Sequence, residues 1–320
     1  MKVLITGANG FLGRNLVSAL LGTTDFDLVG AVRGEGRVVS SRETYVSVGD
    51  ISFDTEWHSA LSGVDVVIHL AARAHVLNES FRNPLCEFRR VNVGGAVSLA
   101  KQSLEHRVKR FIFISSIGVN GAVTTSASVN EDSPYLPHAD YAASKMEAEG
   151  ELRAIAQNSS MELVIIRPPL VYSFDAPGNF SRLLKAVDVG LPLPLGAIRN
   201  ARSIIALENL TDFIKICVSS EAAGNELFLV SDGKDFSTPD IIRMIARGMG
   251  KRPILLPVPD FFLRSVAAIC CRIPVYTQLC KSLVIDSSKA KNLLGWTPPI
   301  DPVKALVQAG MSYKLRKHSL

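Results

Sequence analysis

The fold is decided at the start of the chain, by residues 3–14: Val3-Leu4-Ile5-Thr6-Gly7-Ala8-Asn9-Gly10-Phe11-Leu12-Gly13-Arg14. An apolar, β-branched run leads directly into a loop with glycine at every third position, and a helical pattern follows. Gly7 permits a tight turn, Gly10 lets the backbone approach a pyrophosphate, and Gly13 lets the helix lie close to the strand. The N–H groups at the start of that helix, at Phe11 and Leu12, would face the diphosphate. The stretch therefore predicts a dinucleotide-binding unit.

Beyond this loop, short apolar runs alternate with longer amphipathic stretches. The apolar runs are residues 27–32, 64–70, 110–115 and 163–167, and the helix-like stretches are residues 13–21, 84–105 and 141–156. Strands buried on both faces that alternate with helices are typical of a parallel, doubly wound α/β sheet. We predict a Rossmann domain at residues 1–172. Residues 173–320, where proline and glycine cluster, predict a smaller region from which residues 226–230 return to the sheet.

The composition is that of a globular protein, with 320 residues, 47% of them apolar and 20% charged. The best candidate for a membrane span, residues 261–273, is too short and contains Arg264 and Arg272, so we expect no span. No signal-peptide core follows Lys2, and we expect a cytoplasmic protein. Five cysteines lack paired spacing and predict no metal site. The net charge of +5 comes without a basic run interleaved with aromatics, so no nucleic-acid partner is expected.

The second strand ends where an acidic residue would bind the adenosine ribose of NAD, and here the sequence reads Val32-Arg33-Gly34. A guanidinium at Arg33 can pair with the 2′-phosphate of NADP or stack on adenine. The cofactor is therefore NAD(P), with NADP favoured and NAD left open. Asp50 and Ile51 close the next strand, where the carboxylate can accept a hydrogen bond from adenine. An exposed arginine and a turn aspartate are the simpler alternatives.

A candidate catalytic group begins the helix-like stretch at Tyr141-x-x-x-Lys145. A spacing of four residues places the phenol and the ammonium on one helix face. The ammonium favours phenolate, so we expect the pKa of Tyr141 to fall toward neutral pH. A group of that kind protonates a carbonyl oxygen. Ser115-Ser116, at the end of a preceding strand, adds a hydroxyl that can bond the same oxygen.

Together these motifs resemble the extended short-chain dehydrogenase/reductases that act on nucleotide sugars, the NAD-dependent epimerase/dehydratase family. The resemblance rests on six motifs in order: Thr6-Gly7-x-x-Gly10-x-x-Gly13, His69-Leu70-Ala71-Ala72, Asn92-Val93-x-Gly95, Ser115-Ser116-x-x-Val119-Asn120-Gly121, Tyr141-x-x-x-Lys145 and Arg167-Pro168-x-x-Val171-Tyr172. It covers nearly the whole chain and extends to the turn Leu294-Gly295-Trp296.

The resemblance implies roles for individual residues. It makes Ser116, Tyr141 and Lys145 catalytic, with Lys145 also binding the nicotinamide ribose. The other cofactor residues that it implies are Leu70, Ala71, Ala72, Asn92 and Pro168, and the substrate residues are Ser116, Asn120, Tyr141, Asn179 and Arg202. For His69 we prefer a packed residue at a strand end to a catalytic role.

The finer resemblance is to bacterial UDP-4-keto-6-deoxy-N-acetylhexosamine 4-reductases of surface-polysaccharide synthesis, also known as UDP-N-acetylquinovosamine dehydrogenases. Dehydration is not expected, because the acidic pair of the 4,6-dehydratases is replaced by Ile117 and Gly118. A UDP-hexose 4-epimerase is the first alternative, and a non-catalytic dinucleotide sensor or scaffold is the second. The family's usual homodimer would pair residues 84–105 and 141–156 with a second copy.

Overall fold

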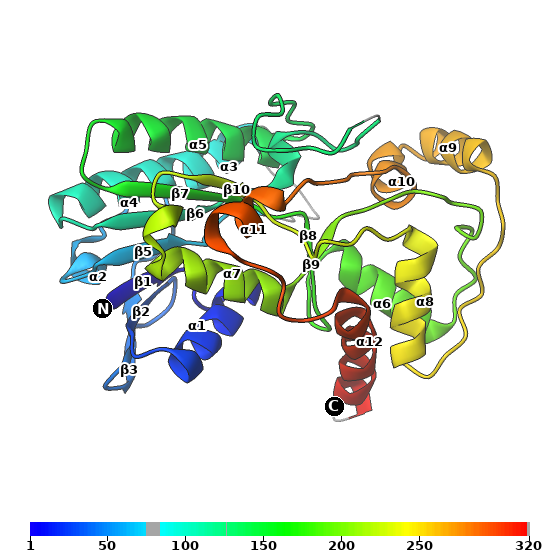
Figure 1. Cartoon of the computed structure of the whole chain (residues 1–320), viewed down its shortest axis with the longest axis horizontal. Coiled ribbons are helices and arrows are strands. Elements are labelled where there is room, and N and C mark those ends of the chain that lie inside the picture. Colours follow the sequence, from blue (N-terminus) through cyan, green and yellow to red (C-terminus); the bar gives the residue numbers. More distant parts are fainter. Residues whose placement is uncertain (75–83, 126, 319–320) are drawn as a thin grey trace.

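The computed structural model describes residues 1–74, 84–125 and 127–318. A central sheet of eight strands has the order β10-β7-β6-β5-β1-β2-β4-β3 (Figure 1). Its strands are β1 (Lys2–Thr6), β2 (Asp27–Val32), β3 (Arg37–Ser40), β4 (Glu43–Ser47), β5 (Val66–His69), β6 (Arg110–Ile114), β7 (Glu162–Arg167) and β10 (Leu227–Leu229). The neighbouring strands are parallel except for β3, which runs antiparallel to β4. The predicted doubly wound α/β fold is confirmed.

Helices cover both faces of the sheet (Figure 1). One face carries α2 (His58–Leu61), α4 (Gly95–Glu105) and α5 (Asp140–Gln157), with α3 (Pro84–Phe88) and the π-helical segment Arg89–Gly94 leading into α4. The other face carries α1 (Phe11–Thr23), α7 (Leu207–Ser219) and α11 (Ser288–Leu294). Both faces are apolar, which is why β1, β2 and β6 read as continuous apolar runs in the sequence.

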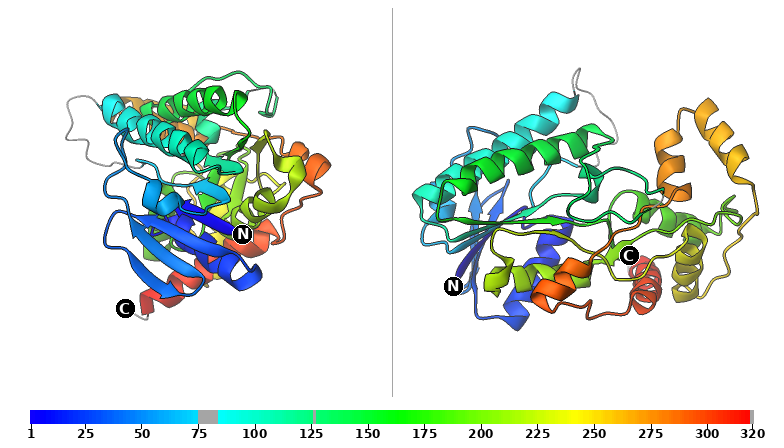
Figure 2. Two further views of the ribbon diagram at one scale, coloured as in Figure 1. Left: turned by 90° about the vertical axis from the view of Figure 1, so that its left-hand side faces the viewer. Right: turned by 45° about the horizontal axis from the view of Figure 1, so that its top comes forward.

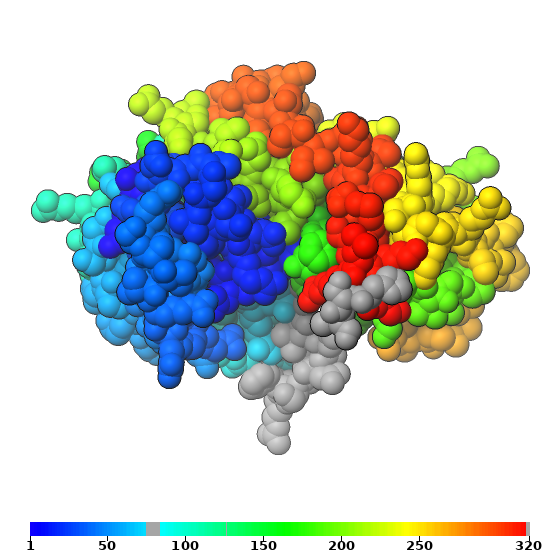
Figure 3. Space-filling view, turned by 90° about the horizontal axis from the view of Figure 1, so that it is seen from below, coloured from blue at the N-terminus to red at the C-terminus, as the bar shows by residue number. Residues whose placement is uncertain are grey.

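The rest of the chain forms a second hydrophobic core beside the carboxyl ends of the strands. It contains the two-stranded sheet of β8 (Leu170–Tyr172) and β9 (Ile204–Ala206), together with α6 (Asn179–Val189), α8 (Thr238–Gly248), α9 (Asp260–Ile269), α10 (Ile273–Cys280) and α12 (Pro302–His318). Short 3-10 turns occur at Ile117–Val119 and Glu221–Ala223. Seen from below, α12 lies between the N-terminal half and the α8 end of the molecule (Figure 3).

The order of the strands fixes where a ligand can bind. From β1 the chain passes first to β2 on one side and later to β5 on the other. In a parallel sheet, the crevice at such a reversal lies outside the carboxyl ends of the strands. Gly7 follows β1 and Leu70 follows β5, so both lie at this point. In the described part of the chain, no helix combines the length and the apolar character that crossing a membrane requires.

Candidate active site

The glycine loop after β1 has the geometry of a phosphate cradle. Gly7 has a φ of +67°, which favours glycine, and the Gly10 N–H donates to its carbonyl oxygen at 2.8 Å. A Cβ at Gly13 would lie 2.2 Å from the same oxygen, so α1 can pack this closely only without a side chain. No side chain caps α1 at Gly10. The N–H groups of the first turn, at Phe11 and Leu12, are thus available to an anion.

The ends of β1 and β5 are tied together beside this loop. The Thr6 hydroxyl is 2.8 Å from His69 Nδ1 and accepts a hydrogen bond from the Ala71 N–H at 3.1 Å. His69 is fully buried and stacks on Phe113, and burial lowers its pKa to about 3. His69 is therefore a neutral, packed residue, as the sequence analysis preferred. A Cβ at Gly7 would come within 3.0 Å of the Ala71 nitrogen, so the two loops approach with little space between them.

Asn92 joins the loop after β5 to the helix that carries Tyr141. Its amide accepts a hydrogen bond from the Arg73 N–H at 2.8 Å and donates to the Ser144 hydroxyl at 2.9 Å. Ser144 in turn donates to the Tyr141 carbonyl at 2.8 Å. Asn92 is fully buried in the π-helical segment, so it supports the site from behind. Leu70, Ala71 and Ala72, partly exposed, form the edge of the loop in front of it.

Arg33 and Asp50 meet at the outer end of the crevice. Arg33 Nε lies 3.0 Å from Asp50 Oδ1, and both side chains are largely exposed, at 83% and 73%. Arg33 follows β2 directly, and β2 pairs with β4. Asp50 and Ile51 were expected to close the strand, but β4 ends at Ser47 and they lie in the loop that follows it. Ile51 follows and packs against Gly95, where a Cβ would lie 2.2 Å from its Cγ2. The residues at this edge fit the adenosine half of a dinucleotide.

Ser116 and Pro168 lie at the carboxyl ends of β6 and β7. Ser116 caps the 3-10 turn by accepting a hydrogen bond from the Gly118 N–H at 3.1 Å, which leaves its own hydrogen available. The Pro168 carbonyl accepts from the Ile117 N–H at 3.0 Å. His138 also lies here, since a Cβ at Gly118 would be 3.3 Å from both its Cε1 and the Ser116 hydroxyl. No motif in the sequence singles out His138, although it stands only three residues before Tyr141.

Tyr141 and Lys145 lie on α5, one turn apart. Lys145 is almost fully buried, donates from Nζ to the Ile114 carbonyl at 2.8 Å, and has Nζ 4.3 Å from the Phe113 ring centroid. Burial lowers its pKa to about 7, against a favourable interaction with Glu149 that raises it. Burial also raises the pKa of Tyr141 to about 12. The expected fall in the Tyr141 pKa is therefore wrong for this structure, because desolvation of the phenol dominates.

Glu149 was also missed, although it stands four residues after Lys145 on the same helix. Its carboxylate accepts hydrogen bonds from the Ser115 hydroxyl and from Arg167, whose Nε is 2.9 Å away. Arg167 also donates to Asn120 Oδ1 at 2.9 Å. The continuing four-residue spacing from Tyr141 was the signal that could have identified it. The Asn120 amide donates to the carbonyls of Ser133 and Pro134, so both its polar atoms are bonded within the protein.

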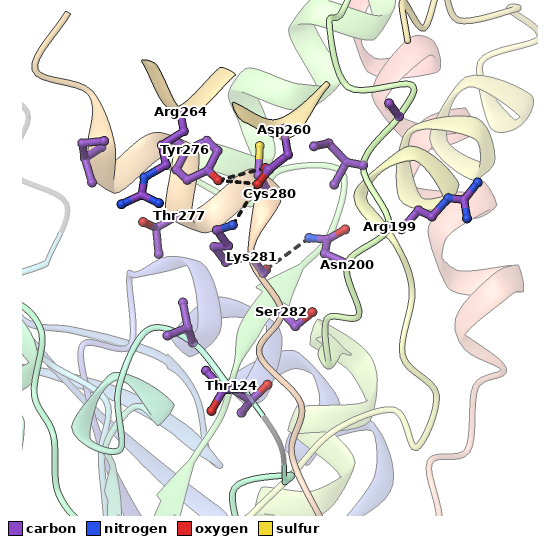
Figure 4. A pocket seen from close by; sticks show the side chains of 15 residues that line it. Thr124, Arg199, Asn200, Asp260, Arg264, Tyr276, Thr277, Cys280, Lys281 and Ser282 are labelled. Atoms are coloured by element: carbon purple, nitrogen blue, oxygen red, sulfur yellow. Dashed lines mark hydrogen bonds and ion pairs between the residues drawn. The ribbon is translucent and has the colours of Figure 1, made fainter. Parts of the chain in front are cut away.

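Asn179 and Arg202 lie next to α10 and the residue that follows it. Asn179 donates to Gln278, and Arg202 donates from Nη1 to the Lys281 carbonyl at 2.9 Å. Close by is a cavity of about 900 Å³. Its walls include residues 197–200, the inner side of α9–α10, and residues 123–125 (Figure 4). Ser116, Tyr141 and Lys145 are not in its lining.

Comparison with known proteins identifies the family. The NAD dependent epimerase/dehydratase family matches residues 3–225. A UDP-glucose 4-epimerase of Vibrio cholerae is 41% identical over 93% of this chain and 91% of its own length. An Escherichia coli O157:H7 N-acetyl-alpha-D-glucosaminyl-diphospho-ditrans,octacis-undecaprenol 4-epimerase is 28% identical over 81% of this chain and 76% of its own.

A solved structure shows the same fold. The UDP-glucuronic acid 4-epimerase of Bacillus cereus, crystallised with UDP-glucuronic acid and NAD, superposes with a TM-score of 0.78 at 24% identity. The alignment covers 99% of this chain and 100% of that one. This chain therefore belongs to the NAD-dependent epimerase/dehydratase family and is an enzyme of the extended short-chain dehydrogenase/reductase type.

Proposed function

We propose that this enzyme acts at C4 of a UDP-sugar and works as a 4-ketoreductase on a UDP-4-keto-6-deoxy-N-acetylhexosamine in surface-polysaccharide synthesis. The observation that carries the proposal is the exposed guanidinium of Arg33, which stands after β2 where an acid would hold the adenosine ribose of a tightly bound NAD. An epimerase keeps its cofactor through the cycle, whereas a reductase must release the oxidised cofactor after every turnover. The absence of an acid at this position therefore favours the reductase.

In the proposed reduction Tyr141, Ser116 and Lys145 have separate roles. When bound, the nicotinamide supplies the hydride that C4 receives. Tyr141 gives its proton to the developing O4 alkoxide, and the Ser116 hydroxyl donates a hydrogen bond to the same oxygen. Lys145, one turn further along α5, would in its protonated form stabilise the phenolate left after proton transfer. The Ile114 carbonyl fixes the position of that charge.

We propose NAD(P) as the cofactor, with a preference for NADP. The glycine cradle and the loop at Leu70–Ala72 fit a diphosphate and an adjoining ribose. The exposed Arg33 side chain supports the preference, because a 2′-phosphate can replace Asp50 as the partner of its guanidinium. Asp50 opposes the preference, since its carboxylate repels a phosphate at the same place. The B. cereus epimerase was crystallised with NAD.

The nucleotide of the substrate is proposed to lie between α6 and α10. Burial lowers the pKa of Arg202, yet at neutral pH the guanidinium remains charged. A charged group in this position suits a diphosphate, and Asn179 can bond its oxygens. The adjoining cavity of about 900 Å³ has room for a ligand of nucleotide size. We also propose that residues 173–320 form most of this binding region and that α4 and α5 pair with a second copy.

UDP-hexose 4-epimerase is the second candidate, and the observation that favours it is the 41% identity to the V. cholerae enzyme of that name. An epimerase oxidises C4 and then reduces it again, so its cofactor is restored in every cycle. A reductase consumes one reduced cofactor for each product. The two candidates therefore differ in cofactor stoichiometry.

The test combines nicotinamide absorbance with chromatography of the sugars, using the purified full chain. We expect oxidation of NADPH or NADH only when a UDP-4-keto-6-deoxy sugar is added, in proportion to the product formed. UDP-glucose and UDP-galactose, and their N-acetyl forms, should not interconvert at a comparable rate. Interconversion without net cofactor use, by protein that carries bound NAD, would replace the reductase with the epimerase. Tyr141→Phe should be strongly impaired in either case and controls for contaminating enzymes.

A further inference from the structure

Helices α9 and α10 form a hairpin that stands out at the edge of the second core, above α8 in Figure 1 (Figures 1 and 2). Its inner side packs on the second core through Leu263, Ala267 and Leu279, with Tyr276 and Cys280 buried. The Tyr276 hydroxyl donates to the Asp260 carboxylate at 2.8 Å and fixes one helix against the other. The hairpin therefore has a defined inner face and a defined outer one.

The outer side of this hairpin is also apolar. It exposes Phe261 (62%), Phe262 (53%), Val266 (58%) and Ile269 (82%) on α9, and Val275 on α10. No residue of α9 is buried. Exposed apolar residues gathered on one element often mark a surface that binds another protein or a membrane.

The hairpin also carries a small excess of positive charge. Residues 260–281 contain three basic residues, Arg264, Arg272 and Lys281, and one acidic residue, Asp260. Asp260 is itself bonded to Tyr276 and Lys281. Arg272 is exposed, and so is Arg264, which also borders the neighbouring cavity. The outer surface is thus apolar and basic, without an unpaired carboxylate of its own.

We propose that the outer face of the α9–α10 hairpin binds the surface of an anionic phospholipid bilayer. Phe261, Phe262 and Ile269 would enter the boundary between headgroups and acyl chains, while Arg264 and Arg272 bind lipid phosphates. This combination of apolar and basic side chains on one short element is what holds amphipathic helices in the membrane interface. The protein would lie on the membrane without crossing it.

Two other occupants fit less well. A second copy docked on the same face would bring Arg264 and Arg272 of both chains together, and like charges across an interface are unfavourable. A nucleic acid would neutralise the charge but offers no apolar region for Val266 or Ile269. A bilayer with anionic headgroups satisfies both features at once. Docking would also place the neighbouring cavity close to the membrane, since Asp260, Arg264 and Tyr276 line it (Figure 4).

The test is flotation of the full chain with lipid vesicles, and it needs no substrate or cofactor. We expect binding to vesicles of phosphatidylcholine mixed with phosphatidylglycerol, little binding to phosphatidylcholine alone, and release when salt rises from about 0.05 to about 0.5 M. Phe261→Ser with Phe262→Ser should reduce partitioning by about tenfold or more, because two exposed rings no longer enter the bilayer. Arg264→Gln with Arg272→Gln should remove the preference for phosphatidylglycerol.

Phe53→Ser is the matched control, because Phe53 is 60% exposed but lies far along the chain from the hairpin, after β4. It should float like the wild type. The proposal fails if the wild type does not float with the anionic vesicles, or if the hairpin variants float as well as it does. It also fails if the double Phe variant lowers the molecular mass in sedimentation without changing flotation, because the face would then join two copies.

Discussion

Glu149 and Arg167 form a buried ion pair beneath the active site, with Arg167 Nε 2.9 Å from Glu149 Oε1 and both side chains at most 2% exposed. The pair links α5, which carries Tyr141 and Lys145, to the end of β7. Ser115 joins it as a donor to Glu149, and Asn120 joins it as an acceptor from Arg167. One charged pair thereby holds together the elements that present the three side chains proposed to be catalytic.

Removing the Glu149 carboxylate should destabilise the folded protein, because it leaves the Arg167 charge buried and uncompensated. We expect Glu149→Gln to lower the free energy of unfolding by about 3–5 kcal/mol, measured by urea denaturation. Glu147→Gln is the control on the same helix. Its partner is Arg89, and that pair is substantially exposed, so a loss of about 0–1 kcal/mol is expected. Equal losses for the two variants would contradict a special role for the buried pair.

The glycine loop makes a second comparison possible within a single helix. A Cβ at Gly13 would lie 2.2 Å from the Gly7 carbonyl oxygen, whereas a Cβ at Gly22 would have no such neighbour within 4 Å. Gly13→Ala should therefore push α1 away from β1 and weaken NAD(P)H binding by about tenfold or more. Gly22→Ala should leave binding unchanged and add up to about 1 kcal/mol of stability. Fluorescence titration with the reduced cofactor measures the first effect.

The buried His69 should make the stability of the folded protein fall in acid. Its pKa is about 3 in the folded protein, because it is buried, and about 6.5 when unfolded. Between these values only the unfolded chain binds the proton, so the folded state loses stability as the pH falls from 6.5 toward 3. At pH 5 this amounts to about 2 kcal/mol. His69→Asn should be less sensitive than the wild type to the change from pH 7 to pH 5, whereas exposed His58→Asn should match the wild type.

Arg33 tests the choice of cofactor. If its guanidinium binds a 2′-phosphate, Arg33→Ala should weaken the binding of NADPH by about 1.5–3 kcal/mol and leave the binding of NADH nearly unchanged. Asp50→Asn should strengthen NADPH, because it removes the carboxylate 3.0 Å from Arg33 Nε. Arg37→Ala, on the neighbouring strand β3, is the control. An equal loss for both dinucleotides in Arg33→Ala would point to stacking on adenine.

The sequence predicted the inner part of the fold well and its edges poorly. The runs at residues 27–32 and 84–105 became β2 and the continuous helical stretch from α3 to α4. Both have apolar patterns imposed by burial. The edge strand β3 was not predicted, because every one of its residues is exposed and Val38 is 76% exposed. An edge strand without a buried face leaves no apolar pattern to detect.

In the candidate site, too, local motifs were predictable from the sequence, whereas contacts that depend on packing were not. The loop at Gly7–Gly13 and the Tyr141–Lys145 spacing are local, so the sequence displays them directly. The Glu149–Arg167 pair joins residues 18 positions apart, and its partnership depends on how α5 packs on β7. The pKa of Tyr141 was predicted with the wrong sign because the sequence contains the charge of Lys145 but not the burial of the phenol.

The last prediction concerns Tyr141 itself. Tyr141→Phe removes only the hydroxyl, so the helix, the Lys145–Ile114 hydrogen bond and cofactor binding should remain intact. Turnover should fall by about 10²–10⁴-fold, the usual contribution of a general acid. Tyr313→Phe on α12 makes the same chemical change far from the site and should be fully active. Steady-state rates with saturating cofactor, together with a cofactor titration of each variant, separate the two effects. If Tyr141→Phe keeps most of its activity, another group supplies the proton, and His138, beside Ser116, becomes the next residue to replace.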